Sequence, residues 1–219
     1  MLNVTKLCVF DFDGTLVNTI YDIAASMNDS LAKMGKATHD TQRYYQMVGN
    51  GMDALCTNAL PGGTDDEVKM LKSIYKEKYL KDCCVLSRPY EGVLELLAGL
   101  KEKGIRFGVI SNKPQDQMDR IIKKFLDYDD FFMIIGQDGR FPVKPATDSI
   151  DYLMQEAQVS KNEVWYIGDS DVDMLFGTAA GVRTIGAAWG FRGEKELTDA
   201  GATKIAQEPL EILSLIESL

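Results

Sequence analysis

Hydrophobic residues along this chain follow two patterns, short continuous runs and longer stretches with helical spacing. The first continuous run, Lys6–Phe10, stops at the acidic residue Asp11. We expect a buried strand there, because strands covered on both faces are apolar throughout. Between the runs, apolar residues recur with the period of amphipathic helices. Strands alternating with helices predict an α/β fold with a doubly wound parallel sheet. The other expected strands are Phe107–Ile110, Phe131–Ile135, Val164–Ile167, Arg183–Ile185 and Thr203–Ala206.

A long section between the first and second expected strands has no strand pattern. From about Thr19 to Asp82 the apolar spacing is helical. A crossover of this length is not a simple βαβ connection. We therefore expect an inserted helical domain at residues 17–86 and an α/β core domain formed by residues 1–16 and 87–219.

Composition and charge narrow the classes of function. The 219 residues are 45% hydrophobic and 26% charged, as in ordinary globular proteins. A net charge of -9 argues against nucleic acid or an anionic membrane surface as a partner, because both would repel the protein. The apolar run near the N-terminus is too short for a signal peptide, and no apolar stretch approaches the ~20 residues of a membrane span. We therefore expect a cytoplasmic protein.

Cysteine and histidine usage excludes further kinds of site. None of the four cysteines forms a C-x-x-C pair, so buried or incidental thiols are favoured over a redox centre. The single histidine, His39, excludes a zinc site built from several histidines. It lies in a polar stretch with no nucleophile elbow nearby, which argues against a Ser-His-Asp triad. If the protein is an enzyme, carboxylates are expected to carry its proton transfers.

Two carboxylates follow the first expected strand, in the segment Asp11-Phe12-Asp13-Gly14-Thr15. Ligands of open parallel sheets bind at the carboxyl ends of the strands. At that position both carboxylates can share one site, whereas within a strand they would point to opposite faces. An ordinary Asp/Gly turn is the alternative, but such turns seldom carry two carboxylates after so apolar a strand. The segment is therefore a candidate catalytic site.

A second acidic group follows the expected strand Val164–Ile167. Asp169, Asp171 and Asp173 are close in sequence, and neighbouring carboxylates repel one another unless a cation neutralises them. Magnesium prefers a few carboxylate oxygens and retained waters. An acidic helix start that complements the helix dipole would explain one of these acids but not the whole group. We therefore expect a divalent cation, with magnesium first and manganese as the alternative.

Two further segments offer a hydroxyl group and a positive charge. Ser111-Asn112-Lys113-Pro114 follows the second expected strand and presents a hydroxyl and a helix start suited to a phosphate oxygen. Taken alone, an ordinary N-cap explains this segment better. Lys144 stands before the expected helix at 149–159, where a surface lysine is an equally good explanation. Only the set of four segments favours a single site.

In this order the four segments resemble those of the haloacid dehalogenase-like hydrolase superfamily. The resemblance covers nearly the whole chain and implies a Rossmann-like core with an inserted α-helical cap. One departure is Thr147, which stands where the family often has a second proline. The segments are Asp11-Phe12-Asp13-Gly14-Thr15, Ser111-Asn112, Lys144-Pro145 and Gly168-Asp169-Ser170-x-x-Asp173.

The resemblance implies a magnesium-dependent phosphatase that works through an aspartyl-phosphate. Asp11 would be the nucleophile, and Asp13 would protonate the leaving oxygen and then deprotonate water. Magnesium would be held by Asp11, by the backbone carbonyl of Asp13 and by Asp169. Ser111 would hold phosphate oxygens, and Lys144 would offset the crowded negative charge.

Supporting roles also follow from the resemblance. Thr15 would orient Asp13, and Asp173 would orient Lys144 or the waters of the metal. The loop Val48-Gly49-Asn50-Gly51 resembles phosphoglycolate phosphatases and their near relatives, so Asn50 and Gly51 are candidates for contacting the organic part of the substrate. A plain turn between helices is the alternative for this loop. Asn112 is a third candidate for substrate binding.

The substrate suggested by this resemblance is a small phosphorylated metabolite, with 2-phosphoglycolate as the leading candidate. Alternatives within the same superfamily are a pyrophosphatase, a nucleotide or sugar phosphatase, and a phosphosugar mutase. An alternative of a different class is a non-catalytic regulator that binds a phosphorylated metabolite. Such a protein would be expected to have lost the nucleophile or the acidic residues, and both are present here. We expect a monomer or a homodimer.

Overall fold

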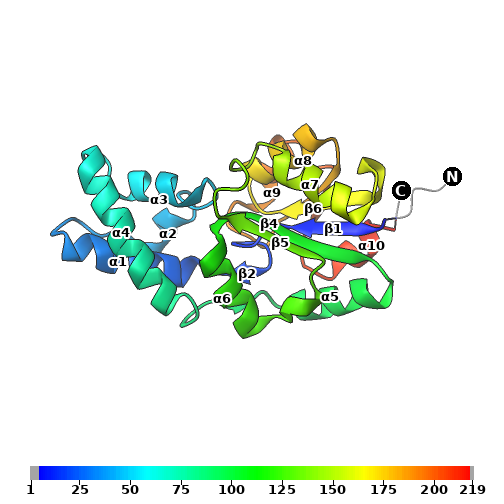
Figure 1. Cartoon of the computed structure of the whole chain (residues 1–219), viewed down its shortest axis with the longest axis horizontal. Helices are drawn as coiled ribbons and strands as arrows, with labels where there is room; N and C mark the ends of the chain where they lie inside the picture. Colours follow the sequence, from blue (N-terminus) through cyan, green and yellow to red (C-terminus); the bar gives the residue numbers. More distant parts are fainter. Residues whose placement is uncertain (1–4, 218–219) are drawn as a thin grey trace.

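The computed structural model describes residues 5–217 and contains the predicted parallel sheet with a helical insert beside it (Figure 1). Each neighbouring pair of strands in the six-stranded sheet is parallel. This confirms the predicted fold class. Across the sheet the strands are β5 (Met133–Gln137), β4 (Arg106–Pro114), β1 (Leu7–Phe10), β6 (Val164–Gly168), β7 (Arg183–Ala187) and β8 (Lys204–Ala206).

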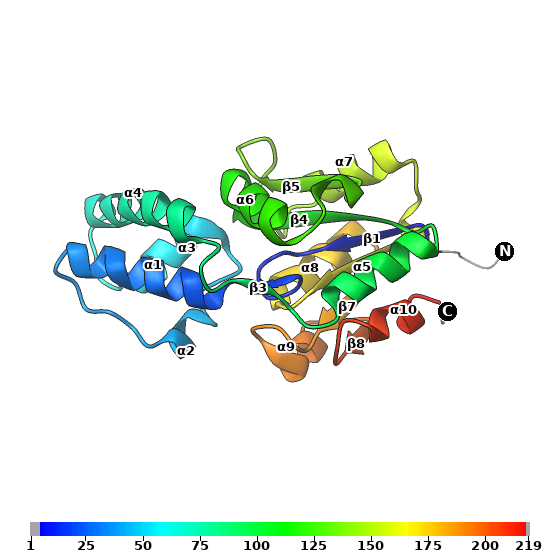
Figure 2. The same cartoon turned by 90° about the horizontal axis from the view of Figure 1, so that it is seen from below.

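The central strand β1 shows why its sequence is apolar throughout. Leu7 and Val9 pack into one hydrophobic cluster, whereas Cys8 and Phe10 pack into another, because successive side chains of a strand point to opposite faces. Helices cover both faces of the sheet (Figures 1 and 2). One layer contains α5 (Val93–Glu102), α6 (Gln115–Phe125) and α10 (Glu211–Leu215), and the other contains α7 (Asp148–Ala157), α8 (Asp171–Ala180) and, against β7 and β8, α9 (Gly193–Asp199).

The helical insert lies to one side of the sheet and consists of α1 (Ile20–Lys33), α2 (Thr41–Tyr44), α3 (Gly51–Ala59) and α4 (Asp65–Asp82). Helices α1 and α4 pack against each other and form its main body (Figure 2). The two chain segments that join the insert to the core pair with each other as the short antiparallel strands β2 (Val17–Asn18) and β3 (Arg88–Pro89). Domain boundaries at residues 17 and 86 stay a prediction.

The observed elements differ from the expected ones at strand ends. The extended backbone of β4 runs to Pro114, although its apolar run ends at Ile110, and its pairing with β5 is irregular between these two residues. Two short 3₁₀ turns precede β5 and β6, at Tyr128–Asp130 and Lys161–Glu163. Within residues 5–217, no helix is both long enough and apolar enough to cross a membrane.

A buried carboxylate ties the insert to the segment that leaves it. Asp22, in the first turn of α1, accepts hydrogen bonds from the backbone amides of Leu86 and Ser87 at 2.8–3.1 Å and from the Ser87 hydroxyl at 2.7 Å. The aspartate and the serine are both buried. These hydrogen bonds satisfy the buried polar groups of the junction, where residues of the insert and of the core also share one hydrophobic cluster.

Removing this carboxylate is expected to destabilise the protein. Asp22→Ala should lower the free energy of unfolding by about 2 kcal/mol, because the buried amide of Ser87 is left without an acceptor. Urea denaturation measures this loss. Asp29→Ala is the matched control on the same helix: Asp29 is exposed and forms a surface ion pair with Lys78, so less than about 1 kcal/mol is expected. Equal losses for the two variants would contradict the assigned role.

Candidate active site

The candidate site lies where the order of strands across the sheet reverses. From β1 the chain continues to β4 and β5 on one side, and then returns to β6 on the other side of β1. In open α/β sheets, ligands bind at the carboxyl ends of the strands beside such a reversal. Asp11 directly follows β1, and Asp169 directly follows β6. These two residues therefore face each other at the position where a ligand is expected.

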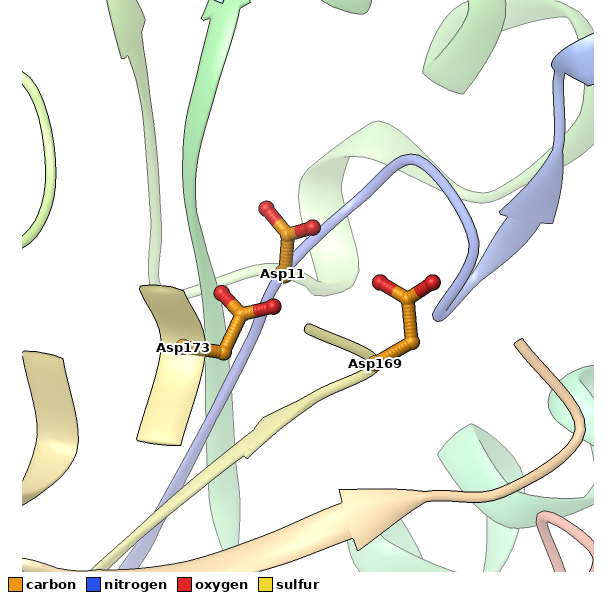
Figure 3. Close-up of side chains that lie close together, drawn as sticks. All are labelled: Asp11, Asp169 and Asp173. Carbon is orange, nitrogen blue, oxygen red and sulfur yellow. The ribbon is translucent and has the colours of Figure 1, made fainter. Parts of the chain in front are cut away.

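Three buried carboxylates meet at this edge of the sheet. Oxygen atoms of Asp11, Asp169 and Asp173 lie within 4.8 Å of one another (Figure 3). Asp173 comes from the first turn of α8, which brings it back toward the end of β6. Asp171 does not belong to this group; its carboxylate accepts a hydrogen bond from the amide of Val172. The acidic segment thus divides into two clustered residues and one ordinary helix-start residue.

Lys144 lies among the carboxylates and is itself buried. Its ammonium nitrogen Nζ lies 2.7 Å from Asp11 Oδ1 and 2.7 Å from Asp173 Oδ1. It also donates to the hydroxyl of Tyr166 at 2.9 Å. Burial lowers the pKa of Lys144, but the charges of Asp11 and Asp173 more than offset this effect and raise it above its ordinary value. The lysine therefore stays charged and holds Asp11 in place.

Both carboxylate oxygens of Asp173 accept hydrogen bonds from other groups of the protein. Oδ1 accepts from Lys144 and Tyr166, and Oδ2 accepts from the backbone amide and the hydroxyl of Ser170 at 3.0 and 2.6 Å. By contrast, Asp11 Oδ2 has no hydrogen-bond donor within residues 5–217. Asp11 is consequently better placed than Asp173 to bind a ligand directly.

The charge balance of the cluster favours a cation. Burial raises the pKa of Asp11 to about 6, and Lys144 only partly opposes this rise. Burial also raises the pKa of Asp169 well above its ordinary value, and the charges of Asp173 and Asp11 add to this effect. One lysine faces three carboxylates, so negative charge remains in excess when all of them are ionised. Hard oxygen donors with excess negative charge fit magnesium or manganese.

The chain around Asp169 is packed closely enough to fix its carboxylate. The backbone amide of Phe191 donates to Oδ2 at 2.7 Å, and the Thr15 hydroxyl lies 3.4 Å from Oδ1. Gly14 has a φ of +88°, and a Cβ atom added there would lie 2.1 Å from Asp169 Oδ2. Only glycine permits this backbone to approach the carboxylate so closely. The Thr15 hydroxyl thus contacts Asp169, and its expected role in orienting Asp13 stays a prediction.

Asp13 is held by a second lysine that the sequence pattern did not single out. Lys113 Nζ lies 2.9 and 3.2 Å from the two oxygens of Asp13, and the Thr19 hydroxyl donates to Oδ1 at 2.6 Å. Lys113 also donates to the hydroxyl of Tyr79, on helix α4 of the insert, at 2.9 Å. Lys113 thus links Asp13 to helix α4 of the insert.

Ser111 and Asn112 have different surroundings. Ser111 is buried, and together with Asp11 and Asp13 it lines a cavity between the core and the insert. The side chain of Asn112 donates to the carbonyls of Gly49 and Lys144 at 2.9 and 3.3 Å and accepts from the amide of Lys144 at 2.8 Å. Its amide therefore cross-links the insert to the loop that carries Lys144. Substrate binding by Asn112 stays a prediction.

A cavity between the core and the insert opens onto these residues. Asp11, Asp13 and Ser111 line it from the core, and apolar side chains of the insert, including Met52 and Leu55, line it from the other side. Gly51 lies on this cavity, whereas the exposed residue Asn50 lies on a neighbouring groove with Lys72 and Lys76. The cavity places an apolar wall opposite the carboxylates.

Three residues of the site carried no usable signal in the sequence. Lys113 lies in the segment Ser111-Asn112-Lys113-Pro114, but a lysine at the start of a helix is ordinarily exposed, so the sequence offers no reason to place it in the site. Tyr166 lies within an apolar strand, and Tyr79 lies on the apolar face of a helix. Their hydroxyl groups become informative only when the fold places them beside Lys144 and Lys113.

Comparison with known proteins is consistent with this geometry. The model of the haloacid dehalogenase-like hydrolase family matches residues 8–187. A phosphoglycolate phosphatase of Mannheimia succiniciproducens is 29% identical over 96% of this chain and 98% of that protein. A phosphoglycolate phosphatase of Colwellia psychrerythraea is 32% identical over 91% of this chain and 92% of that protein. An N-acetylmuramic acid 6-phosphate phosphatase of Pseudomonas aeruginosa is 29% identical over 97% of this chain and 95% of that protein.

A solved structure shares the whole architecture. The crystal structure of a predicted phosphoglycolate phosphatase from Haemophilus somnus superposes with a TM-score of 0.92 at 27% identity, covering 98% of this chain and 99% of that one. The helical insert and the sheet therefore occur together in a second protein of similar length.

Proposed function

We propose that this chain, which belongs to the haloacid dehalogenase-like hydrolase family, hydrolyses the phosphomonoester of a small metabolite through an aspartyl-phosphate on Asp11. The observation that carries the proposal is the state of the Asp11 carboxylate. Lys144 fixes one of its oxygens, and the other has no donor within residues 5–217 and belongs to a residue that lines the cavity. A carboxylate that is held in place but free at one oxygen is suited to nucleophilic attack.

The proposed metal ligands are the carboxylates of Asp11 and Asp169 and the backbone carbonyl of Asp13. The excess of negative charge around Lys144 supports a divalent cation at this position. Bound magnesium would supply positive charge that offsets the charge of the phosphoryl group. Asp173 would act indirectly, by holding Lys144.

The proposed reaction has two steps. Asp11 attacks phosphorus, the bond from phosphorus to the leaving oxygen breaks, and Asp13 gives that oxygen a proton. Water then attacks the phosphoryl group on Asp11, Asp13 takes a proton from this water, and phosphate leaves. Ser111 would hold phosphate oxygens in both steps, and Lys144 would keep Asp11 oriented. Both aspartates return to their starting states.

For the substrate, the relatives support a small phosphomonoester, with 2-phosphoglycolate as the first candidate. The similarity to an N-acetylmuramic acid 6-phosphate phosphatase makes a sugar phosphate the second candidate. The apolar wall supplied by the insert would exclude water from the reacting groups when a substrate occupies the cavity.

Removing divalent cations is expected to abolish phosphate release. After chelation, kcat with p-nitrophenyl phosphate should fall at least roughly 100-fold, and added magnesium should restore it, because Asp11 and Asp169 then regain their counter-charge. Measuring the release of phosphate as a function of magnesium concentration tests this prediction. A separate panel of phosphoglycolate, pyrophosphate and hexose phosphates would rank the candidate substrates by kcat/KM. Full turnover in the chelated protein would contradict the proposed metal site.

A further inference from the structure

The cavity contains one polar side chain for which the proposed reaction has no use. Gln117 lies in the first turn of α6 and is only 1% exposed. Within residues 5–217, its amide nitrogen Nε2 has no hydrogen-bond partner. A buried amide without a partner is unfavourable, so such groups in folded proteins call for a specific explanation. Gln117 lines the same cavity as Asp11 and Asp13.

The neighbouring glutamine shows that this situation is not general to the start of α6. Gln115 donates from Nε2 to Asp119 at 2.8 Å and accepts from the amide of Gly136 at 2.6 Å. Both polar atoms of its amide therefore have a protein partner, and the hydrogen bond from Gly136 connects the helix to β5. Gln117 differs because it lines the cavity and its buried amide nitrogen has no acceptor among the described residues.

The surroundings of Gln117 limit what could satisfy it. Phosphate is expected at Asp11 and Ser111, so the organic part of a substrate extends along the cavity toward the insert. There the wall is apolar, with Met52 and Leu55 among its residues. Lys113, the nearby cation, already binds Asp13 and Tyr79. The amide of Gln117 is thus a hydrogen-bond donor still available to the organic part.

We infer that Gln117 determines substrate specificity by donating a hydrogen bond to an oxygen acceptor on the organic part of the phosphomonoester. This inference rests on the proposed phosphatase activity. The acceptor is a carboxylate or hydroxyl oxygen carried close to the phosphate. An ester without such an oxygen leaves the buried amide unpaired, and sites of this kind discriminate strongly against substrates that lack the matching polar group.

The test compares three small esters: phosphoglycolate with a carboxylate, 2-hydroxyethyl phosphate with a hydroxyl, and propyl phosphate with neither. The wild-type protein should prefer one or both oxygen-bearing esters by kcat/KM. In Gln117→Met, which keeps the length of the side chain but removes the donor, the preference over propyl phosphate should fall by about 10-fold to 100-fold. The wild-type ranking of the first two esters identifies which oxygen is bound.

Gln155→Met is the matched control, because Gln155 is exposed on α7, in the layer on the opposite face of the sheet from α6. It should keep the wild-type preference. A purely structural role of Gln117 would lower kcat/KM for all three esters by the same factor, and an unchanged preference in Gln117→Met would overturn the inference while leaving the phosphatase activity standing. If the wild-type protein hydrolyses none of the esters and no p-nitrophenyl phosphate, the proposed function fails, and the inference fails with it.

Discussion

Asp11→Asn is expected to lower kcat with p-nitrophenyl phosphate by at least about 10⁴-fold, as removal of a catalytic nucleophile does in other enzymes. The amide is a far weaker nucleophile than the carboxylate, and it also weakens the proposed metal site. Asparagine has nearly the same shape as aspartate, so the fold should persist. Steady-state release of p-nitrophenol measures the loss, and circular dichroism verifies that the variant is folded.

Asp171→Asn is the control for this variant. Asp171 begins helix α8, just after β6, but it does not belong to the carboxylate cluster. Its carboxylate accepts a local hydrogen bond from the amide of Val172. Its kcat should stay within about threefold of the wild-type value, since asparagine keeps a side-chain oxygen for the Val172 amide and leaves the three clustered carboxylates unchanged. Retained turnover in Asp11→Asn would remove the nucleophile assignment.

Asp13→Asn is expected to lower kcat by about 10²-fold to 10⁴-fold, the contribution typical of general acid–base catalysis. The two steps should respond differently. The p-nitrophenolate leaving group needs little help from an acid, whereas attack by water still needs a base. Phosphorylated Asp11 should therefore accumulate, and rapid mixing should show a burst of p-nitrophenol followed by a slow steady rate.

The network around Asp13 offers a comparison for that result. Thr19→Val removes the hydroxyl that donates to Asp13 but leaves the carboxylate and its contact with Lys113. This variant should lose less activity than Asp13→Asn and show no burst, because the base is still present. A variant of Asp13 with an unchanged rate of dephosphorylation would show that another group activates water.

The sheet and its catalytic edge could be predicted because they depend on local patterns. Continuous apolar runs locate parallel strands, and the ends of such strands share one edge, so Asp11 and Asp169 could be placed together from the sequence. Lys144 could be assigned only through the family resemblance. Its loop carries no periodic signal, and its contact with Asp11 depends on how the chain returns after β5.

The contacts between the insert and the core could not be predicted. Tyr79 and Gln117 lie on helices whose apolar spacing indicates burial but not what the polar atoms meet. Asn112, on the core, shows the same limit. It follows Ser111 in a segment that resembles the family, yet the sequence does not indicate that its side-chain amide binds the backbone at Gly49 and Lys144. Such pairings depend on how the insert is placed relative to the core, which local sequence patterns do not encode.

The most direct test of the mechanism is to locate the phosphoryl group during turnover. Asp13→Asn and the wild-type protein are mixed with magnesium and p-nitrophenyl phosphate that carries a radiolabelled phosphoryl group, quenched in acid within the first turnover, and digested for peptide mapping. We predict that the label is on the peptide containing Asp11 and that more label accumulates in the variant. Label on a different residue, or rapid hydrolysis by the wild-type protein with no labelled peptide at any time, would contradict the aspartyl-phosphate mechanism.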